Sequence, residues 1–397
     1  MALTDVVICG AGPVGLLAAL GLARQGVAVT VLEAGAAVSP APRANGYFPP
    51  TLDLLERYGL LEEAESIAYR SEIIHFRFPS TGAIIPMSMG VLEGQVAHPY
   101  FLHFGQGRLG EMIVERLSAM PNAEVRFGCE VRQVSQDDAG VTVTFGSPNG
   151  ETRLRAPWLI GADGARSAVR RLIGVGFDGF TWPDRYVATN VWYDFEKHGF
   201  APNNMIHDPV NWAIVTRLGP EPLWRVTFGE DADLPEDEVL RRIPERYAAI
   251  LPGSDPYEIA AAAPYRVHER AATRFRQGRV LLAGDAAHAC NPIGGMGLTS
   301  GAFDAQALSD VLGALLRGEV EESLLDVYAE ERRKLFLEFA SPWAQGHKRR
   351  IQEADPVLQR AGQDELQRIS EDPVKVAMAQ SAAFPIAGRS LLPARAL

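Results

Sequence analysis

The sequence predicts an α/β protein in which a parallel-sheet, nucleotide-binding unit is interrupted by a mainly antiparallel β-sheet and followed by C-terminal helices. Three observations predict this fold class. Residues 5–34 read as strand, glycine-rich turn, helix and strand, which is the order of a βαβ unit. Residues 176–270 read mainly as strands. After them, the buried-strand pattern of Val280–Ala283 returns the chain to the nucleotide-binding unit.

The amino-terminal turn carries a dinucleotide fingerprint. Gly10, Gly12 and Gly15 form GxGxxG directly after an apolar run, and such glycines permit a tight turn, close approach of a pyrophosphate and close helix–strand packing. Glu33 ends the second strand, near the spacing of about 20 residues expected for a ribose-binding acid. An acid there disfavours a 2′-phosphate, so FAD or NAD is favoured over NADP. A turn that serves only packing is the alternative.

A second strand–turn–helix segment lies at residues 156–174. The strand Trp158–Gly161 runs into Asp163-Gly164, and Ser167 and a basic run follow on a short helix. Taken alone, this segment reads equally well as a strand–helix turn with a solvated basic face.

The third and most informative segment is residues 281–305. A buried strand leads to Gly284-Asp285, then to a Pro/Gly-rich loop and the start of an amphipathic helix. This order suits a ligand with both a ribose and an electron-rich end. The carboxylate can accept hydrogen bonds from hydroxyl groups, and the free N–H groups of a helix N-terminus can meet developing negative charge.

Together the three segments resemble the group A FAD-dependent aromatic hydroxylases, the flavoprotein monooxygenases similar to p-hydroxybenzoate hydroxylase. The resemblance covers roughly residues 4–340. It implies that Asp285 binds the ribityl or pyrophosphate region of FAD and that the Asp163 segment serves both FAD and NAD(P)H. It also implies that the loop from Pro292 to Thr299 lies along the isoalloxazine ring. That loop includes Gly295, Gly297 and Leu298. The family often has Asn where this chain has Thr299, which puts that side-chain contact in doubt.

Two further segments match the family less strongly. Residues 42–60 resemble the loop and helix where Arg43 would contact FAD, and residues 104–117 resemble the helix that would offer Gln106 and Arg108. The resemblance also implies a backbone contact of Val131 with the adenine. The alternatives are a solvated Arg43, and an Arg108 that pairs with an acid of its own helix.

The predicted domain organisation is discontinuous, with the flavin ring and the substrate at the domain junction. Residues 1–70, 102–175 and 271–345 form the Rossmann-like FAD-binding domain. Residues 71–101 and 176–270 form the inserted substrate domain, and residues 346–397 form a C-terminal helical segment. The run 324–354 is expected to be helical with a break near Ser341-Pro342.

The function that the resemblance implies is hydroxylation of a phenol-like or N-heteroaromatic small molecule. NADH or NADPH would reduce FAD, and O2 would then form a C4a-hydroperoxyflavin that transfers its distal oxygen to the ring. Weak candidates for contacting the substrate are His207, Tyr193 and Arg225. Residues of these types more often have a structural role than a catalytic one. No catalytic base is assigned.

Other functions share this fold. A reductase or epoxidase of a quinone- or isoprenoid-type substrate is the main alternative. A flavin-dependent halogenase would carry a WxWxIP segment, whereas this chain offers only Asn211-Trp212-Ala213-Ile214. A homologue that binds FAD without turnover is a third alternative, which the intact motifs disfavour.

Composition narrows the partners. The 397 residues include 49 acidic and 38 basic side chains, a net charge of −11, which argues against binding nucleic acid or an anionic membrane. Three scattered cysteines are too few for a disulfide framework or a zinc site, and no metal is expected. We therefore expect a cytoplasmic protein without a membrane anchor, either a monomer or a homodimer.

Overall fold

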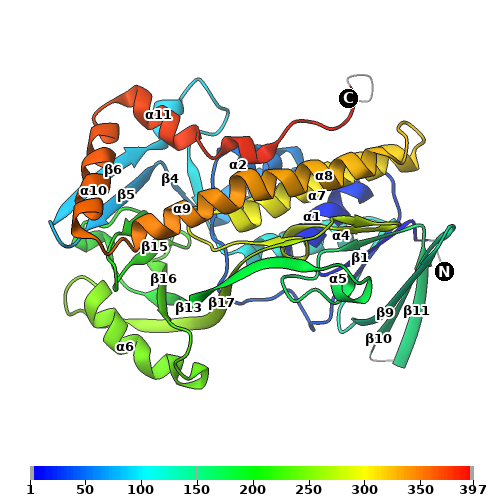
Figure 1. The fold of residues 1–397 in the computed structure, drawn as a ribbon, viewed down its shortest axis with the longest axis horizontal. Helices are drawn as coiled ribbons and strands as arrows, with labels where there is room; N and C mark the ends of the chain where they lie inside the picture. Colours follow the sequence, from blue (N-terminus) through cyan, green and yellow to red (C-terminus); the bar gives the residue numbers. More distant parts are fainter. Residues whose placement is uncertain (1–3, 148–149, 394–397) are drawn as a thin grey trace.

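The computed structural model describes residues 4–147 and 150–393 (Figure 1). Its first layer is a six-stranded sheet with the strand order β18-β19-β12-β1-β2-β8. All neighbours are parallel except β18 and β19. The strands are β1 (Val6–Cys9), β2 (Val29–Leu32), β8 (Ala123–Arg126), β12 (Trp158–Gly161), β18 (Arg276–Gln277) and β19 (Val280–Leu282). The early and late strands predicted from the sequence thus lie in one sheet.

Three helices pack on this sheet or on one another: α1 (Pro13–Ala23), α4 (Gln106–Ser118) and α7 (Met296–Leu316). Helix α1 is apolar on all sides, which is typical of a helix buried between neighbours. It contacts both α4 and α7. A Cβ at Gly21 would lie 2.5 Å from Ser309 Oγ, so glycine is needed for this close approach of α1 to α7.

Smaller elements surround the parallel sheet. One three-stranded sheet has the order β11-β10-β9 and another has the order β3-β7-β4. The strands are β3 (Gly46–Tyr47), β4 (Tyr69–Ser71), β7 (Phe101–His103), β9 (Glu130–Asp137), β10 (Gly140–Ser147) and β11 (Gly150–Ala156). The helices are α2 (Pro49–Arg57), α3 (Leu61–Ile67) and α5 (Ala168–Leu172).

The second layer is an eight-stranded sheet with the order β20-β17-β13-β16-β15-β14-β5-β6. Its strands, in that order, are His288–Ala289, Glu258–Ala272, Phe177–Trp192, Leu223–Asp231, Ala213–Arg217, Asn203–Ile206, Ile73–Phe78 and Ala83–Ser88. Only β14 and β5 are parallel; the other pairs are antiparallel. The early hairpin therefore joins the later strands, as the sequence predicts. Helix α6 (Val239–Ile250) packs on one face of this sheet.

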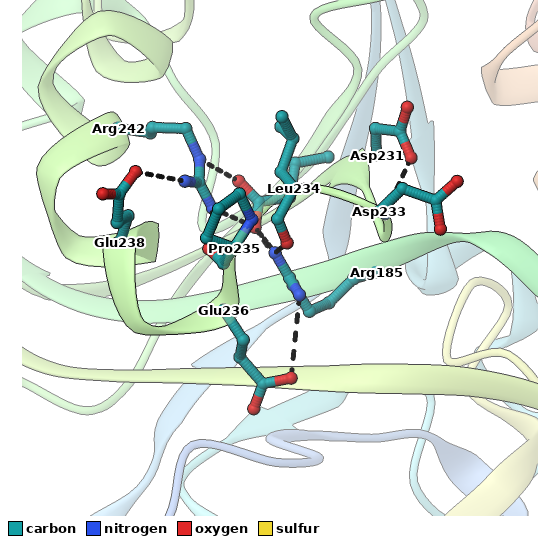
Figure 2. A network of polar contacts seen from close by, with 9 residues as sticks. Arg185, Asp231, Asp233, Leu234, Pro235, Glu236, Glu238 and Arg242 are labelled. Carbon is teal, nitrogen blue, oxygen red and sulfur yellow. Dashed lines mark hydrogen bonds and ion pairs between the residues drawn. The ribbon is translucent and has the colours of Figure 1, made fainter.

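A buried ion network ties β13 to the segment before α6 (Figure 2). The guanidinium of Arg185 bonds Glu230 and the carbonyl of Leu234 and lies 3.6 Å from Glu236. Arg242 on α6 bonds the same Glu230 at 2.9 Å. Both arginines lower the pKa of Glu230 against the opposing effect of burial. Because the charges of Arg185, Glu230 and Arg242 are paired, the network holds α6 against the interior strands β13 and β16.

The C-terminal helices begin with a long run, α8 and α9, that crosses the molecule, and α10 and α11 follow it beside β6 (Figure 1). They are α8 (Leu324–Leu335), a π-helical turn (Phe336–Ala340), α9 (Ser341–Ile351), α10 (Pro356–Ser370) and α11 (Pro373–Ser381). The expected break near Ser341-Pro342 is wrong, since the helical path continues into α9. Pro342 stands in the first turn of α9, where its missing N–H is tolerated. In the described ranges, no helix is both long and apolar enough to span a bilayer.

Candidate functional site

A cavity of about 1700 Å³ lies between the carboxyl ends of the parallel strands and the inner face of the eight-stranded sheet. Cavities for one small ligand are usually about 300–1,000 Å³, so this space suits two ligands. The following residues of the predicted cofactor set line it: Gly10, Gly12, Glu33, Arg43, Gln106, Val131, Asp163, Asp285, Pro292, Gly295, Gly297 and Leu298. Gly15, Arg108 and Thr299 are not among its lining residues.

The three glycines of the amino-terminal turn occupy different surroundings. Gly10 has a φ of +106°, and a Cβ there would lie 2.4 Å from the carbonyl oxygen of Ala162. A Cβ at Gly15 would lie 2.1 Å from the carbonyl oxygen of Gly10. At Gly12 a Cβ would meet no protein atom within 4 Å. Gly10 and Gly15 therefore serve backbone packing, whereas Gly12 leaves open space at the first turn of α1.

Glu33 stands at the end of β2 and faces the same turn. Its carboxylate accepts hydrogen bonds from the backbone N–H of Ala11 at 2.8 Å and of Gly35 at 2.7 Å. The acid thereby holds the glycine-rich turn against the strand end while it lines the cavity.

Asp285 is exposed to the cavity, although protein surrounds the site. This enclosure raises the pKa of its carboxyl group, while the charges of His288 and Arg43 lower it. Among the described residues, none donates a hydrogen bond to the Asp285 side chain. The carboxylate is therefore available to a ligand.

A buried cluster behind Asp285 fixes the turn that presents it. Asp304 on α7 accepts hydrogen bonds from Gly284 N at 3.0 Å, His288 Nε2 at 2.6 Å and Arg332 Nε at 2.7 Å. Burial opposes ionisation of Asp304, but the charges and hydrogen bonds of His288 and Arg332 lower its pKa to about 2. Arg332 also bonds the carbonyl oxygen of Ile386, so the same cluster holds the C-terminal segment.

The loop before α7 presents backbone groups to the cavity. Gly294 and Gly295 have φ values of +93° and +73°, a region that favours glycine. Glu269 holds the loop from behind, because it accepts hydrogen bonds from Asn291 N at 3.0 Å and Ser341 Oγ at 2.8 Å. No side-chain cap covers the first N–H groups of α7.

Three predicted cofactor residues point elsewhere. The hydroxyl of Thr299 donates to the carbonyl of Gly295 at 2.8 Å, because the side chain turns back onto its own helix. Arg108 is 61% exposed and pairs with Glu111 at 2.6 Å, as the alternative interpretation expects. The carboxylate of Asp163 accepts from Ser167 Oγ and Val169 N at the start of α5. Asp163 therefore lines the cavity while its oxygens serve the fold.

The three candidate substrate residues separate in the structure. His207 follows β14, is buried, and lines the cavity. Arg225 also lines it, and its guanidinium donates to Asn190 Oδ1 and to the carbonyl of Arg43. The hydroxyl of Tyr193 instead donates to the carbonyl of Pro252, and Tyr193 does not line the cavity.

The C-terminal helices also contribute to the cavity, which no sequence pattern predicts. Trp343 and His347 on α9 and Gln380 on α11 line it. The polar side-chain atoms Trp343 Nε1, His347 Nε2 and Gln380 Nε2 are buried without a hydrogen-bond partner in the described ranges. No motif marks these residues, because only the docking of the helices brings them to the sheet.

Comparisons with known proteins agree with this geometry. A family model described as an FAD binding domain matches residues 3–339. The chain is 48% identical over 357 residues to para-nitrophenol 4-monooxygenase of Pseudomonas sp. (strain WBC-3), over 89% of both chains. It is 43% identical over 352 residues to 6-hydroxy-3-succinoylpyridine 3-monooxygenase HspB of Pseudomonas putida (strain DSM 28022 / S16), over 88% of this chain and 90% of the relative.

Solved structures show the same similarity. The crystal structure of p-nitrophenol 4-monooxygenase PnpA from Pseudomonas putida DLL-E4 aligns with a TM-score of 0.94 at 43% identity, over 98% of this chain and 99% of that one. The flavin-dependent monooxygenase PieE in complex with FAD and substrate aligns with a TM-score of 0.80 at 25% identity, over 97% and 72% of the two chains.

Proposed function

Because this chain belongs to the FAD-dependent aromatic hydroxylase family of flavoproteins, we propose that its cavity holds FAD along the parallel sheet and a para-substituted hydroxyl-bearing ring against the eight-stranded sheet. The chain is an FAD-dependent monooxygenase that hydroxylates an aromatic compound. The observation that carries the proposal is one continuous cavity that touches both the glycine-rich turn and the inner face of the second sheet.

The residues present fit FAD. Open space at Gly12, next to the uncapped first turn of α1, suits a pyrophosphate. The unengaged carboxylate of Asp285 suits a hydroxyl of the ribityl chain. The free N–H groups at the start of α7 suit the electron-rich end of the flavin ring. Glu33 would bind the ribose, and Arg43, Gln106 and the backbone of Val131 complete the proposed FAD contacts.

Bound FAD supplies the chemistry that takes electrons from NADH or NADPH and uses O2 to oxygenate the ring. The chain contributes binding, orientation and exclusion of water. The N–H groups at the start of α7 would stabilise negative charge on the flavin, and a preorganised donor of this kind is typically worth about 3 kcal/mol. We further propose that the domain division follows the boundaries predicted from the sequence, with both ligands at the junction.

The substrate class follows from the relatives. Each relative's name places a ring hydroxyl opposite a second substituent, at positions 1 and 4 of nitrophenol and positions 6 and 3 of the pyridine. Each name also gives, as the position of the reaction, the ring carbon that carries this second substituent. We call the part of the cavity against the eight-stranded sheet the ring site. Its walls include Ile74, Phe76, Met87, Met89 and Met205, which favour a flat apolar ring. The quinone or isoprenoid reductase alternative is not favoured by these relatives.

Anaerobic reduction of the FAD-loaded protein tests this proposal. Flavin bleaching by NADH and by NADPH would be followed with and without p-nitrophenol, 6-hydroxy-3-succinoylpyridine or 3-(3-hydroxyphenyl)propionate, and products would be analysed after O2 is admitted. We expect one of the two para-substituted compounds to accelerate bleaching and to be hydroxylated. Equal bleaching rates with and without every aromatic compound, and no oxygenated product, would overturn the proposal.

A further inference from the structure

Four cavity-lining residues carry buried polar atoms without partners, and three of them, on α9 and directly after β14, lie on one wall of the ring site. His207 Nε2, Trp343 Nε1, His347 Nε2 and Gln380 Nε2 belong to cavity-lining residues and have no hydrogen-bond partner among the described residues. Buried polar atoms in native proteins are nearly always hydrogen-bonded. A cluster of unpartnered atoms beside a cavity therefore indicates that a ligand supplies the missing partners.

His207 can only accept a hydrogen bond from such a ligand. Its Nδ1 lies 3.3 Å from the carbonyl oxygen of Arg350, and because a carbonyl only accepts, Nδ1 carries the proton. Burial and the charge of Arg350 lower the pKa of His207 to about 4 despite this hydrogen bond, so the ring is neutral near pH 7. Nε2 therefore has a free lone pair. The ring is 7% exposed and stacks on Phe78 at 4.7 Å, which fixes its orientation.

Trp343 offers the opposite property, because an indole N–H only donates. Its ring lies 4.6 Å from that of His347, one turn further along α9. A Cβ at Gly294 would lie 2.9 Å from Trp343 Nε1 and 3.4 Å from His347 Cδ2. Trp343 therefore stands against the loop before α7, the part of the cavity where the flavin ring is proposed to lie.

We propose that His207 Nε2 accepts the hydrogen bond of the substrate's ring hydroxyl and that Trp343 Nε1 donates to the acceptor group opposite it. This inference rests on the proposed function and deepens it to two specificity-determining residues. In this arrangement the ring carbon that carries the acceptor group faces the loop before α7, and the hydroxyl points away from that loop. Helix α9, which carries Trp343, then selects the acceptor group, while His207 after β14 selects the hydroxyl para to it.

Binding of three small probes to the FAD-loaded protein tests the two contacts separately. The probes are p-nitrophenol, which has both groups, nitrobenzene, which lacks the hydroxyl, and phenol, which lacks the nitro group. Calorimetric titration of the wild type is expected to show p-nitrophenol binding at least about tenfold more tightly than either single-group probe. Such a titration measures affinity without turnover.

His207→Phe keeps a flat ring on Phe78 and removes Nε2. We expect it to lose the preference for p-nitrophenol over nitrobenzene while its affinity for nitrobenzene changes less than about twofold. Trp343→Phe is expected to lose the preference for p-nitrophenol over phenol instead. His75→Phe is the matched control, since His75 lies on the neighbouring strand β5 but does not line the cavity. It should keep both preferences.

The outcomes separate two kinds of failure. If the wild type hydroxylates p-nitrophenol but His207→Phe and Trp343→Phe keep both preferences, the assignment of the two contacts is overturned while the proposed function stands. If the wild type shows no preference among the probes and no oxygenation of any para-substituted ring, both fail together. Flavin absorbance and the thermal midpoint of each variant verify folding. Should one variant not fold, the other still tests its own contact.

Discussion

Individual residues in the site have separable tasks, and the glycine-rich turn shows this most clearly. Gly10 and Gly15 touch backbone atoms of the protein, whereas Gly12 faces only open cavity. In the sequence the three glycines form one motif. The structure separates those that the fold needs from the one that a ligand needs.

Gly12→Ala should weaken FAD binding without weakening the protein. The new methyl group would enter space that contains no protein atom and that we assign to the pyrophosphate. We expect the FAD dissociation constant to rise about tenfold or more, which corresponds to about 1.4 kcal/mol. The unfolding free energy of the FAD-free protein should stay within about 0.5 kcal/mol of the wild type.

Gly10→Ala provides the contrast. Its φ of +106° and the 2.4 Å approach to the carbonyl of Ala162 should destabilise the FAD-free protein itself. Fluorescence titration with FAD and urea unfolding of the apoprotein measure the two quantities. Equal loss of apoprotein stability in both variants would contradict the assignment of Gly12 to the ligand.

His103 should make stability depend on pH. It is fully buried, neither ring nitrogen has a partner in the described part of the chain, and burial lowers its pKa to about 4. The unfolded chain, with a pKa near 6.5, binds the proton more tightly between about pH 6.5 and pH 4. Stability is therefore lost as the pH falls through this window.

His103→Phe should reduce this loss. Between about pH 7 and pH 5 the variant is expected to lose about 2 kcal/mol less unfolding free energy than the wild type. Urea unfolding at both pH values measures the difference. Above about pH 7 the two proteins should respond alike, because neither state of His103 is protonated there. Identical responses below pH 6 would contradict the role of this buried ring.

At the scale of elements, α7 and α8 hold the turn that presents Asp285. Asp304 lies on α7 and Arg332 on α8, and their ion pair contacts the Gly284 backbone and the C-terminal segment. Buried charges are tolerated in this interior when each is paired with an opposite charge. Removal of one partner leaves the remaining charge buried and unpaired.

Asp304→Asn should therefore destabilise the protein by about 3–5 kcal/mol. The asparagine cannot balance the charge of Arg332, which is almost fully buried. Asp310→Asn is the matched control on the same helix. Its ion pair with Arg57 at 2.7 Å is partly exposed and should cost no more than about 1 kcal/mol. Denaturant unfolding compares them, and similar costs would argue against the structural role of the buried cluster.

At the scale of the whole molecule, the cavity joins chain segments that are far apart in sequence. The amino-terminal turn, the early hairpin, the later strands and helices α9 to α11 all line it. A ligand in this space would contact both large sheets at once, and binding to the folded state alone stabilises that state.

Removal of FAD should accordingly lower the stability of the whole chain. At a free FAD concentration about 100 times the dissociation constant, binding should add about 2.7 kcal/mol to the unfolding free energy. Differential scanning calorimetry of stripped and reloaded protein measures the change in thermal midpoint. Riboflavin, which lacks the pyrophosphate and adenosine, is the control and should restore less. A midpoint independent of FAD would contradict the placement of the cofactor between the sheets.

Local residue order predicts the fold class, the family and most of the proposed FAD contacts. Tight turns and helix N-termini depend on local residue order, so Gly10, Gly12 and Glu33 could be predicted from spacing, and Asp285 from the family resemblance. The helical break at Pro342 was predicted wrongly, because a π-helical turn before it accommodates the proline.

The ring site, in contrast, depends on contacts between elements that are far apart in the chain. His207 is only a weak candidate from the sequence, and no local pattern marks His347, which lies 140 positions later on a helix. The packing of α9 across the sheet places these residues and Trp343 on one cavity wall. Arg108, Thr299 and Tyr193 lie outside the lining because each bonds a partner elsewhere in the fold. Such a site forms where side chains from distant helices and strands pack together. Its residues have no fixed spacing in the sequence, so no motif can mark them.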